Sequence, residues 1–170
     1  MNTKLEKVAR MGGKTTYKDF REGFAACSLM GDSDADIKAA LGIAQRHVGA
    51  MAVQALETRY ASMLHHERGL RRAWDRQLRD AKSGKRSSHD AAVQRMSAAL
   101  AIRRFAGARM IQHEVAEYAW MSCARREVIE QYMRDCGAWL DSLCGEAERA
   151  FLEALGGIRP RRLDGTRKMA

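Results

Sequence analysis

Apolar residues recur along most of the chain at intervals of three or four positions, which is the pattern of amphipathic helices. The alternation of Val, Ile, Thr and aromatic residues that marks strands is absent, and Pro160 is the single proline. Ala, Arg, Met, Leu, Glu and Gln are abundant, and all of them favour helices. The pattern therefore predicts an all-α fold.

The chain is expected to form six helices joined by short connections. The Lys82–His89 segment, KSGKRSSH, is typical of a loop, and Ser88 or Asp90 could cap the helix that follows it. Gly156, Gly157 and Pro160 predict the end of the last helix and a mobile basic tail over residues 158–170. The expected helices are Tyr17–Met30, Ser33–Leu41, Ala44 to about Arg79, Ser88 to about Ala106, Ala108 to about Asp135 and Ala138–Leu155.

The later helices supply most of the expected core. We therefore predict long packed helices, as a helical hairpin or bundle, over residues 61–157, behind an N-terminal helical module of residues 1–60. This apolar surface exceeds what a small module needs for its own core, which favours self-association into a homo-oligomer. The expected core positions are Val93, Met96, Leu100, Ile111, Val115, Tyr118, Ile129, Tyr132, Met133, Cys136, Trp139, Leu140, Leu143, Phe151 and Leu155.

Residues 34–51, DADIKAALGIAQRHVGAM, carry the most specific local pattern. Apolar side chains on two short helices would face each other, and Gly42 would supply the positive φ of the bend between them. The segment, about residues 33–53, resembles the bacterial and phage helix-turn-helix motif. It departs from the motif at Lys38, where a small residue is usual, although Ala39 and Ala40 could provide the close approach. The facing positions are Ile37, Leu41, Ile43, Val48 and Met51.

Three polar side chains follow this bend and would project away from the apolar face: Gln45, Arg46 and His47. Gln can pair with adenine and Arg with guanine in the major groove, while His47 could contact a phosphate or a base edge. The alternative is a simple helical corner with these three side chains in solvent.

Charge is distributed unevenly along the chain, whose formal net charge is +9. Residues 67–110 contain 12 basic and 4 acidic residues, whereas residues 111–157 contain 4 basic and 9 acidic residues. This division favours either contact with a nucleic acid, with DNA preferred over RNA, or head-to-tail complementarity between subunits.

The basic segment includes an arginine stripe, which we define as Arg68, Arg72, Arg76 and Arg79. Their spacings of 4, 4 and 3 place them on one helical face, and Arg71 borders it. This face, extended by Lys82, Lys85 and Arg86, could neutralise several phosphates without reading bases. The alternative is a solvated or subunit-pairing face, interrupted by Glu67, Asp75 and Asp80. Leu64, Leu70, Trp74 and Leu78 would occupy the other side of the helix.

Signals for enzymatic chemistry are poor, so we expect no enzyme, no cofactor and no metal. The HEVAE segment from His113 to Glu117 departs from the zinc-protease HExxH motif, and an ordinary surface pair is the expected interpretation. Phosphate-binding and nucleophile motifs such as GxxxxGK[ST], GxGxxG and GxSxG are absent. The four cysteines form no CxxC pair and are expected to pack as reduced, small apolar residues: Cys27, Cys123, Cys136 and Cys144.

The longest stretch without a charged residue, His47–Leu56, has ten residues, whereas a membrane-spanning helix needs roughly 20. We therefore expect no membrane span. The first 13 residues include Lys4, Glu6, Lys7 and Arg10, and the apolar segment of a signal peptide does not follow them. This pattern predicts a cytoplasmic protein, which for a viral protein means the host cytoplasm.

The layout of a helix-turn-helix in the first third, long helices and a charged tail resembles the small terminase subunits of tailed bacteriophages. The resemblance implies an oligomer that recognises viral DNA through Gln45, Arg46 and His47 and passes it to a large ATPase and nuclease subunit. One alternative is a transcriptional regulator with a helical dimerisation domain. Another is a helical small subunit of an RNA-guided ribonucleoprotein, in which the arginine stripe follows a nucleic-acid backbone.

Overall fold

The computed structural model describes residues 34–62, 64–81, 87–108 and 112–166, which form helices and short connections without a strand. The all-α class is confirmed for this part of the chain. The expected helix Tyr17–Met30 lies outside the described residues. The elements are α3 (Asp34–Val48), α4 (Ala50–Ala61), the 3-10 helix η2 (Leu64–His66), α5 (Glu67–Ala81), α6 (Ser88–Phe105), α7 (Gln112–Ser122) and α8 (Arg126–Thr166).

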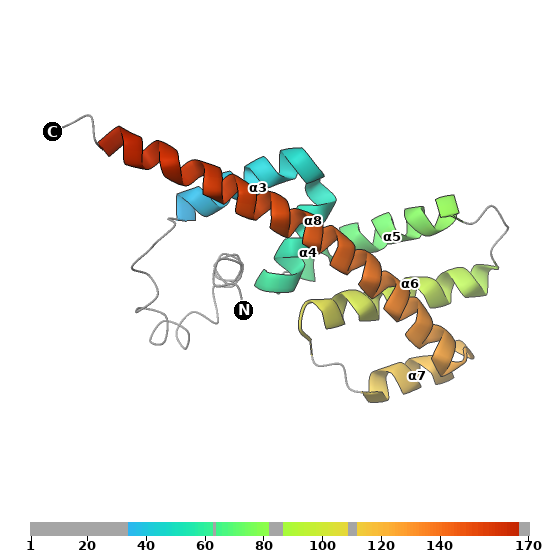
Figure 1. Cartoon of the computed structure of the whole chain (residues 1–170). Helices are drawn as coiled ribbons and strands as arrows, with labels where there is room; N and C mark the ends of the chain where they lie inside the picture. The colour runs from blue at the N-terminus through green and yellow to red at the C-terminus, as the bar shows by residue number, and fades with distance from the viewer. Residues whose placement is uncertain (1–33, 63, 82–86, 109–111, 167–170) are drawn as a thin grey trace.

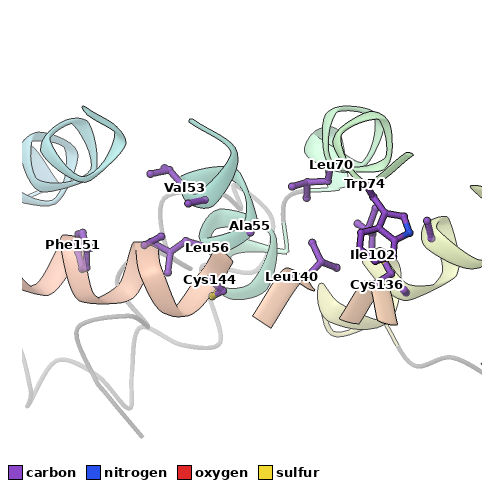
Figure 2. Close-up of a cluster of buried hydrophobic side chains, with 14 of the residues drawn as sticks. Val53, Ala55, Leu56, Leu70, Trp74, Ile102, Cys136, Leu140, Cys144 and Phe151 are labelled. Carbon is purple, nitrogen blue, oxygen red and sulfur yellow. The ribbon is translucent and has the colours of Figure 1, made fainter. Parts of the chain in front are cut away.

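The long helix α8 is the element on which most of the others pack (Figure 1). Its 41 residues correspond to a length of roughly 60 Å at 1.5 Å per residue. Helices α3, α4 and α6 lie along it, and α5 packs against α6 and α4. Figure 2 shows buried side chains that α4, α5, α6 and α8 contribute to one apolar cluster. The buried stripe of α8 consists of Ile129, Met133, Cys136, Leu140, Cys144, Ala147, Phe151, Ala154 and Leu155.

The expected break in this region, between Asp135 and Ala138, is wrong. The buried stripe advances by three or four residues throughout, so one helix buries the whole stripe, and interrupting it would expose apolar surface. Gly137 lies beside the stripe with no heavy atom within 4 Å of where a Cβ would be, so it neither requires nor forces a turn. Burial of the neighbouring stripe residues offsets the cost of a helical glycine, which is about 1 kcal/mol.

The expected end of the last helix at Gly156–Pro160 is also wrong. The backbone of α8 stays helical to Thr166, so residues 158–166 are not an irregular tail. Packing accounts for the helix as far as Leu155, which is buried. Nothing among the described residues explains its continuation past Pro160.

The bend expected at Gly42 lies seven residues later. Helix α3 is continuous from Asp34 to Val48, and its buried residues include Ile37, Leu41 and Ala44. The turn into α4 is at Gly49, whose φ of 88° and ψ of 161° are accessible almost only to glycine. The prediction that the chain bends at Gly42 is therefore wrong, because burial of the α3 face outweighs the weak helix propensity of one glycine.

Two expected long helices are divided at residues that are neither glycine nor proline. The helix expected from Ala44 to Arg79 is interrupted at Gly49, as described above, and again at Ser62, which has a φ of 51° and whose hydroxyl donates to the carbonyl of Ala106 at 3.0 Å. The helix expected from Ala108 to Asp135 breaks at Cys123, which has a φ of 50°. Left-handed conformations at such residues are uncommon. The bond from Ser62 to Ala106 joins segments distant in sequence, and His89 lies 2.7 Å from the carbonyl of Ser122, next to Cys123. Local sequence alone gave no signal for either break.

The expected core is largely confirmed, with three corrections and two positions that lie outside the described residues. Met96 is 43% exposed and Leu64, in η2, is 45% exposed, so neither belongs to the core. Cys136 and Cys144 are buried as expected, whereas Cys123 is exposed. Cys27 and Ile111 lie outside the described residues. One apolar cluster includes residues from both sides of the expected boundary at residue 60, because α3 and α4 pack on α8.

A polar network joins α4 to α8 beside this core. Tyr60 donates a hydrogen bond to Glu148 at 2.7 Å, and the Cys144 thiol donates to the same carboxylate oxygen at 3.4 Å. Arg59 pairs with Asp141 at 2.5 Å. Burial, together with the bond to Glu148, raises the pKa of Tyr60 to about 12. The network therefore fixes the register of α4 on α8.

Substitution by alanine should have opposite effects on stability at Gly49, in the turn between α3 and α4, and at Gly42, inside α3. Gly49→Ala should lower the free energy of unfolding by about 1 to 3 kcal/mol, because alanine at this φ and ψ is strained. Gly42→Ala should raise it by roughly 0.5 to 1 kcal/mol, because the position is helical and open. Urea denaturation of the two variants measures both, and destabilisation by Gly42→Ala would restore the bend to that residue.

The raised pKa of Tyr60 predicts a pH dependence. The folded protein favours the neutral phenol, so this stabilisation is complete below the ordinary tyrosine pKa of 10.0 and is lost as pH rises towards about 12. Tyr60→Phe should therefore lower stability at pH 8 by roughly 1.5 to 3 kcal/mol, the usual range for a hydrogen bond to a charged group. The difference from the unmodified protein should shrink above pH 10 in thermal melts; a constant difference up to pH 12 would contradict the assignment.

Candidate nucleic-acid interface

Helix α5 has one apolar and one basic face, as the sequence predicts. Leu70 and Trp74 are buried, and Leu78 packs on the core at its edge. The Trp74 ring lies against the Trp139 ring of α8, with centroids 5.3 Å apart and planes tilted by 38°. These contacts fix the rotation of α5 and so determine which residues point into solvent.

All four members of the arginine stripe lie on the exposed face of α5. Arg79 pairs with Asp75 one turn earlier, at 3.1 Å. Within the described part of the chain, Arg68, Arg72 and Arg76 have no ion pair or side-chain hydrogen bond. Three guanidinium groups on successive turns are therefore available to an external anion.

A second group of arginines borders the start of this stripe. Glu67 lies 3.7 Å from Arg71 in the same helix and 3.6 Å from Arg103 of α6, so one carboxylate faces two cations. Arg104 follows Arg103 and is exposed. Arg103 and Arg104 were not singled out from the sequence, because they lie more than 20 residues from the stripe and only the packing of α6 on α5 brings them near. The sequence feature that could have drawn attention to Arg103 and Arg104 is that two arginines are adjacent at the end of an expected helix.

Gln45, Arg46 and His47 occupy the last turn of α3 and are exposed, as expected from the helical spacing. They lie on a different helix from the stripe, and α4 contacts both helices. Cationic side chains at the end of a helix also interact favourably with its dipole, so their position is compatible with a structural role. Lys82, Lys85 and Arg86 lie outside the described residues.

The remaining polar features of the described residues show no assembled chemical site. His113 and Glu117 form an exposed pair at 3.8 Å, one turn apart. In residues 34–166, apart from the gaps given above, no group of three or more His, Cys, Asp or Glu side chains is placed to hold a metal ion. Within the same part of the chain, every helix is too short or too polar to cross a membrane.

Comparison with protein-family models, with curated proteins and with solved structures finds no match to this chain.

Proposed function

We propose that this protein binds nucleic acid through the arginine stripe of α5. The observation that carries the proposal is the set of three exposed arginines without an ion pair among the described residues, on a helix whose opposite face is fixed in the core. Arginine is suited to phosphate because its planar guanidinium can donate two hydrogen bonds to one group. Arg71, Arg103 and Arg104 extend the basic surface at the start of the stripe.

In this proposal the stripe provides affinity and α3 provides selectivity. Phosphate contacts position a protein on a duplex, whereas base edges carry sequence information. The base contacts would come from Gln45, Arg46 and His47 in the last turn of α3 rather than from α4, because six of the 12 residues of α4 are buried. The expected helix-turn-helix thereby becomes a corner with its turn at Gly49, and DNA is the favoured partner.

The narrower proposal is a homo-oligomer that recognises viral DNA for packaging, as the resemblance to small terminase subunits implies, and acts with a large ATPase and nuclease subunit. A dimeric transcriptional regulator and a helical subunit of an RNA-guided complex are the alternatives. The mass of the particle in light scattering distinguishes them: a ring of many copies supports the first, a dimer the second and a monomer the third.

Replacing the exposed arginines Arg68, Arg72 and Arg76 should change the salt dependence of nucleic-acid binding. The triple variant Arg68→Gln, Arg72→Gln, Arg76→Gln should flatten the slope of log affinity against log salt on duplex DNA by up to about 2.7, at roughly 0.9 per lost phosphate contact. Fluorescence anisotropy with a labelled duplex measures the slope.

The matched control removes the same charge from the acidic segment: Arg126→Gln, Arg134→Gln, Arg149→Gln, three exposed positions of α8. The control should leave the slope nearly unchanged. An equal change in both variants would mean that only net charge matters, and an unchanged slope in the α5 variant would exclude the stripe from the interface.

The α3 side chains should affect selectivity rather than general affinity. A preferred duplex is first selected from a random library with the unmodified protein. Gln45→Ala with Arg46→Ala should then weaken binding to that duplex by about 1 to 3 kcal/mol per lost bidentate contact, while binding to random DNA changes little. Equal losses on both duplexes would show that these residues contact phosphates or nothing specific.

A further inference from the structure

Helix α7 exposes two large apolar side chains in adjacent positions. Trp120 is 82% exposed and Met121 is 61% exposed, which makes them the most exposed large apolar residues of the described chain. We call this pair the α7 apolar patch. Aromatic and methionine side chains are the residues enriched at the centre of protein interfaces.

The α7 apolar patch lies in an acidic setting. Helix α7 contains Glu114 and Glu117 and has no lysine or arginine. Glu117 is exposed and lies one helical turn before both Trp120 and Met121. Because the indole of Trp120 protrudes, a surface that covers the patch should be flat enough to accept it. Because α7 is acidic, that surface should also carry positive charge.

This chain presents such a surface on α3. Ala35, Ala39 and Gly42 are exposed on one side of that helix, and no heavy atom lies within 4 Å of where a Cβ on Gly42 would be. Lys38 is exposed beside them. We call this surface the α3 flat face. It has no bulky apolar side chain of its own, so it can accept a protruding indole while the Lys38 cation faces the carboxylates of α7.

The two surfaces cannot meet within one molecule. Helix α7 is joined through Cys123–Arg125 to the first residue of α8, whereas α3 lies along the C-terminal half of α8 (Figure 1). The α7 apolar patch of one copy can therefore reach only the α3 flat face of another copy.

We infer that this protein self-associates head to tail, with Trp120 and Met121 of one copy packed on the α3 flat face of the next copy. Such an interface joins two different surfaces, so repetition gives a closed ring or an open filament rather than a two-fold dimer. The arrangement leaves the arginine stripe of α5 uncovered. The inference rests on the self-association included in the proposed function, but not on nucleic-acid binding.

The test measures the mass of the full chain by light scattering over a concentration series. Trp120→Ser removes the exposed indole, and Gly42→Glu places bulk and negative charge on the α3 flat face. Both positions are exposed and the glycine is helical, so both variants should fold, which circular dichroism checks. Each variant should weaken association by about 30-fold, as expected for a residue at an interface hot spot. Met96→Ser is the matched control, because Met96 is 43% exposed on α6, and it should keep the parent mass.

Mixing the two variants distinguishes a head-to-tail interface from other arrangements. The Gly42→Glu chain keeps an intact α7 patch and the Trp120→Ser chain keeps an intact α3 face, so an equimolar mixture should form a one-to-one dimer and nothing larger. A mixture that stays monomeric would overturn the inference. So would a monomeric parent protein, a Trp120→Ser variant of unchanged mass, or a Gly42→Glu variant that still associates, since the last result indicates pairing of α7 with itself.

The same variants separate this inference from the proposed function. Trp120→Ser should bind a short duplex with the salt slope of the parent protein, because the arginine stripe is unchanged. The mass reports on α7 and α3, and the salt slope reports on α5. Either proposal can therefore fail while the other holds.

Discussion

The buried stripe of α8 is the constraint on which the rest of the structure depends. Small side chains occupy three of its fully buried positions, Cys136, Cys144 and Ala147, so neighbouring helices can approach closely. Leu140, between Cys136 and Cys144, and Phe151, one turn after Ala147, are the large fully buried side chains of this stretch. Helices α3, α4 and α6 bury their apolar faces against the same helix, so none of these faces would be covered if α8 were interrupted.

The surface properties of the protein follow from how each helix meets this core. Helix α5 packs on α6 and α4 through Leu70 and Trp74, and this contact directs its arginines outward. Helix α4, unlike α5, is surrounded by other helices and has little exposed surface for a ligand. Helix α7 packs at the start of α8 through Val115 and leaves Trp120 in solvent.

Charge and exposed apolar surface are separated among the helices, so the two proposed interactions would use different surfaces of one small chain. The exposed arginines of α5 suit a polyanion, since long-range attraction to phosphate needs no shape complementarity. The α7 apolar patch suits a protein partner, because burying an indole requires a fitted surface. The polar network of Tyr60 and Glu148 holds α4, which also contacts α5, against α8.

The sequence by itself determined the helical class, the buried face of α5 and the exposure of its arginines, because these follow from local propensity and a period of 3.6 residues. It did not determine where helices begin and end. The bend predicted at Gly42, the break predicted between Asp135 and Ala138 and the end predicted at Gly156 are absent from the structure, while Ser62 and Cys123 turn the chain without a local signal. The sequence also did not predict that Met96 is exposed or that Arg103 lies close to Glu67. Only the tertiary structure decided these features, because they depend on which apolar faces meet along α8, and that burial outweighs the preference of any single residue.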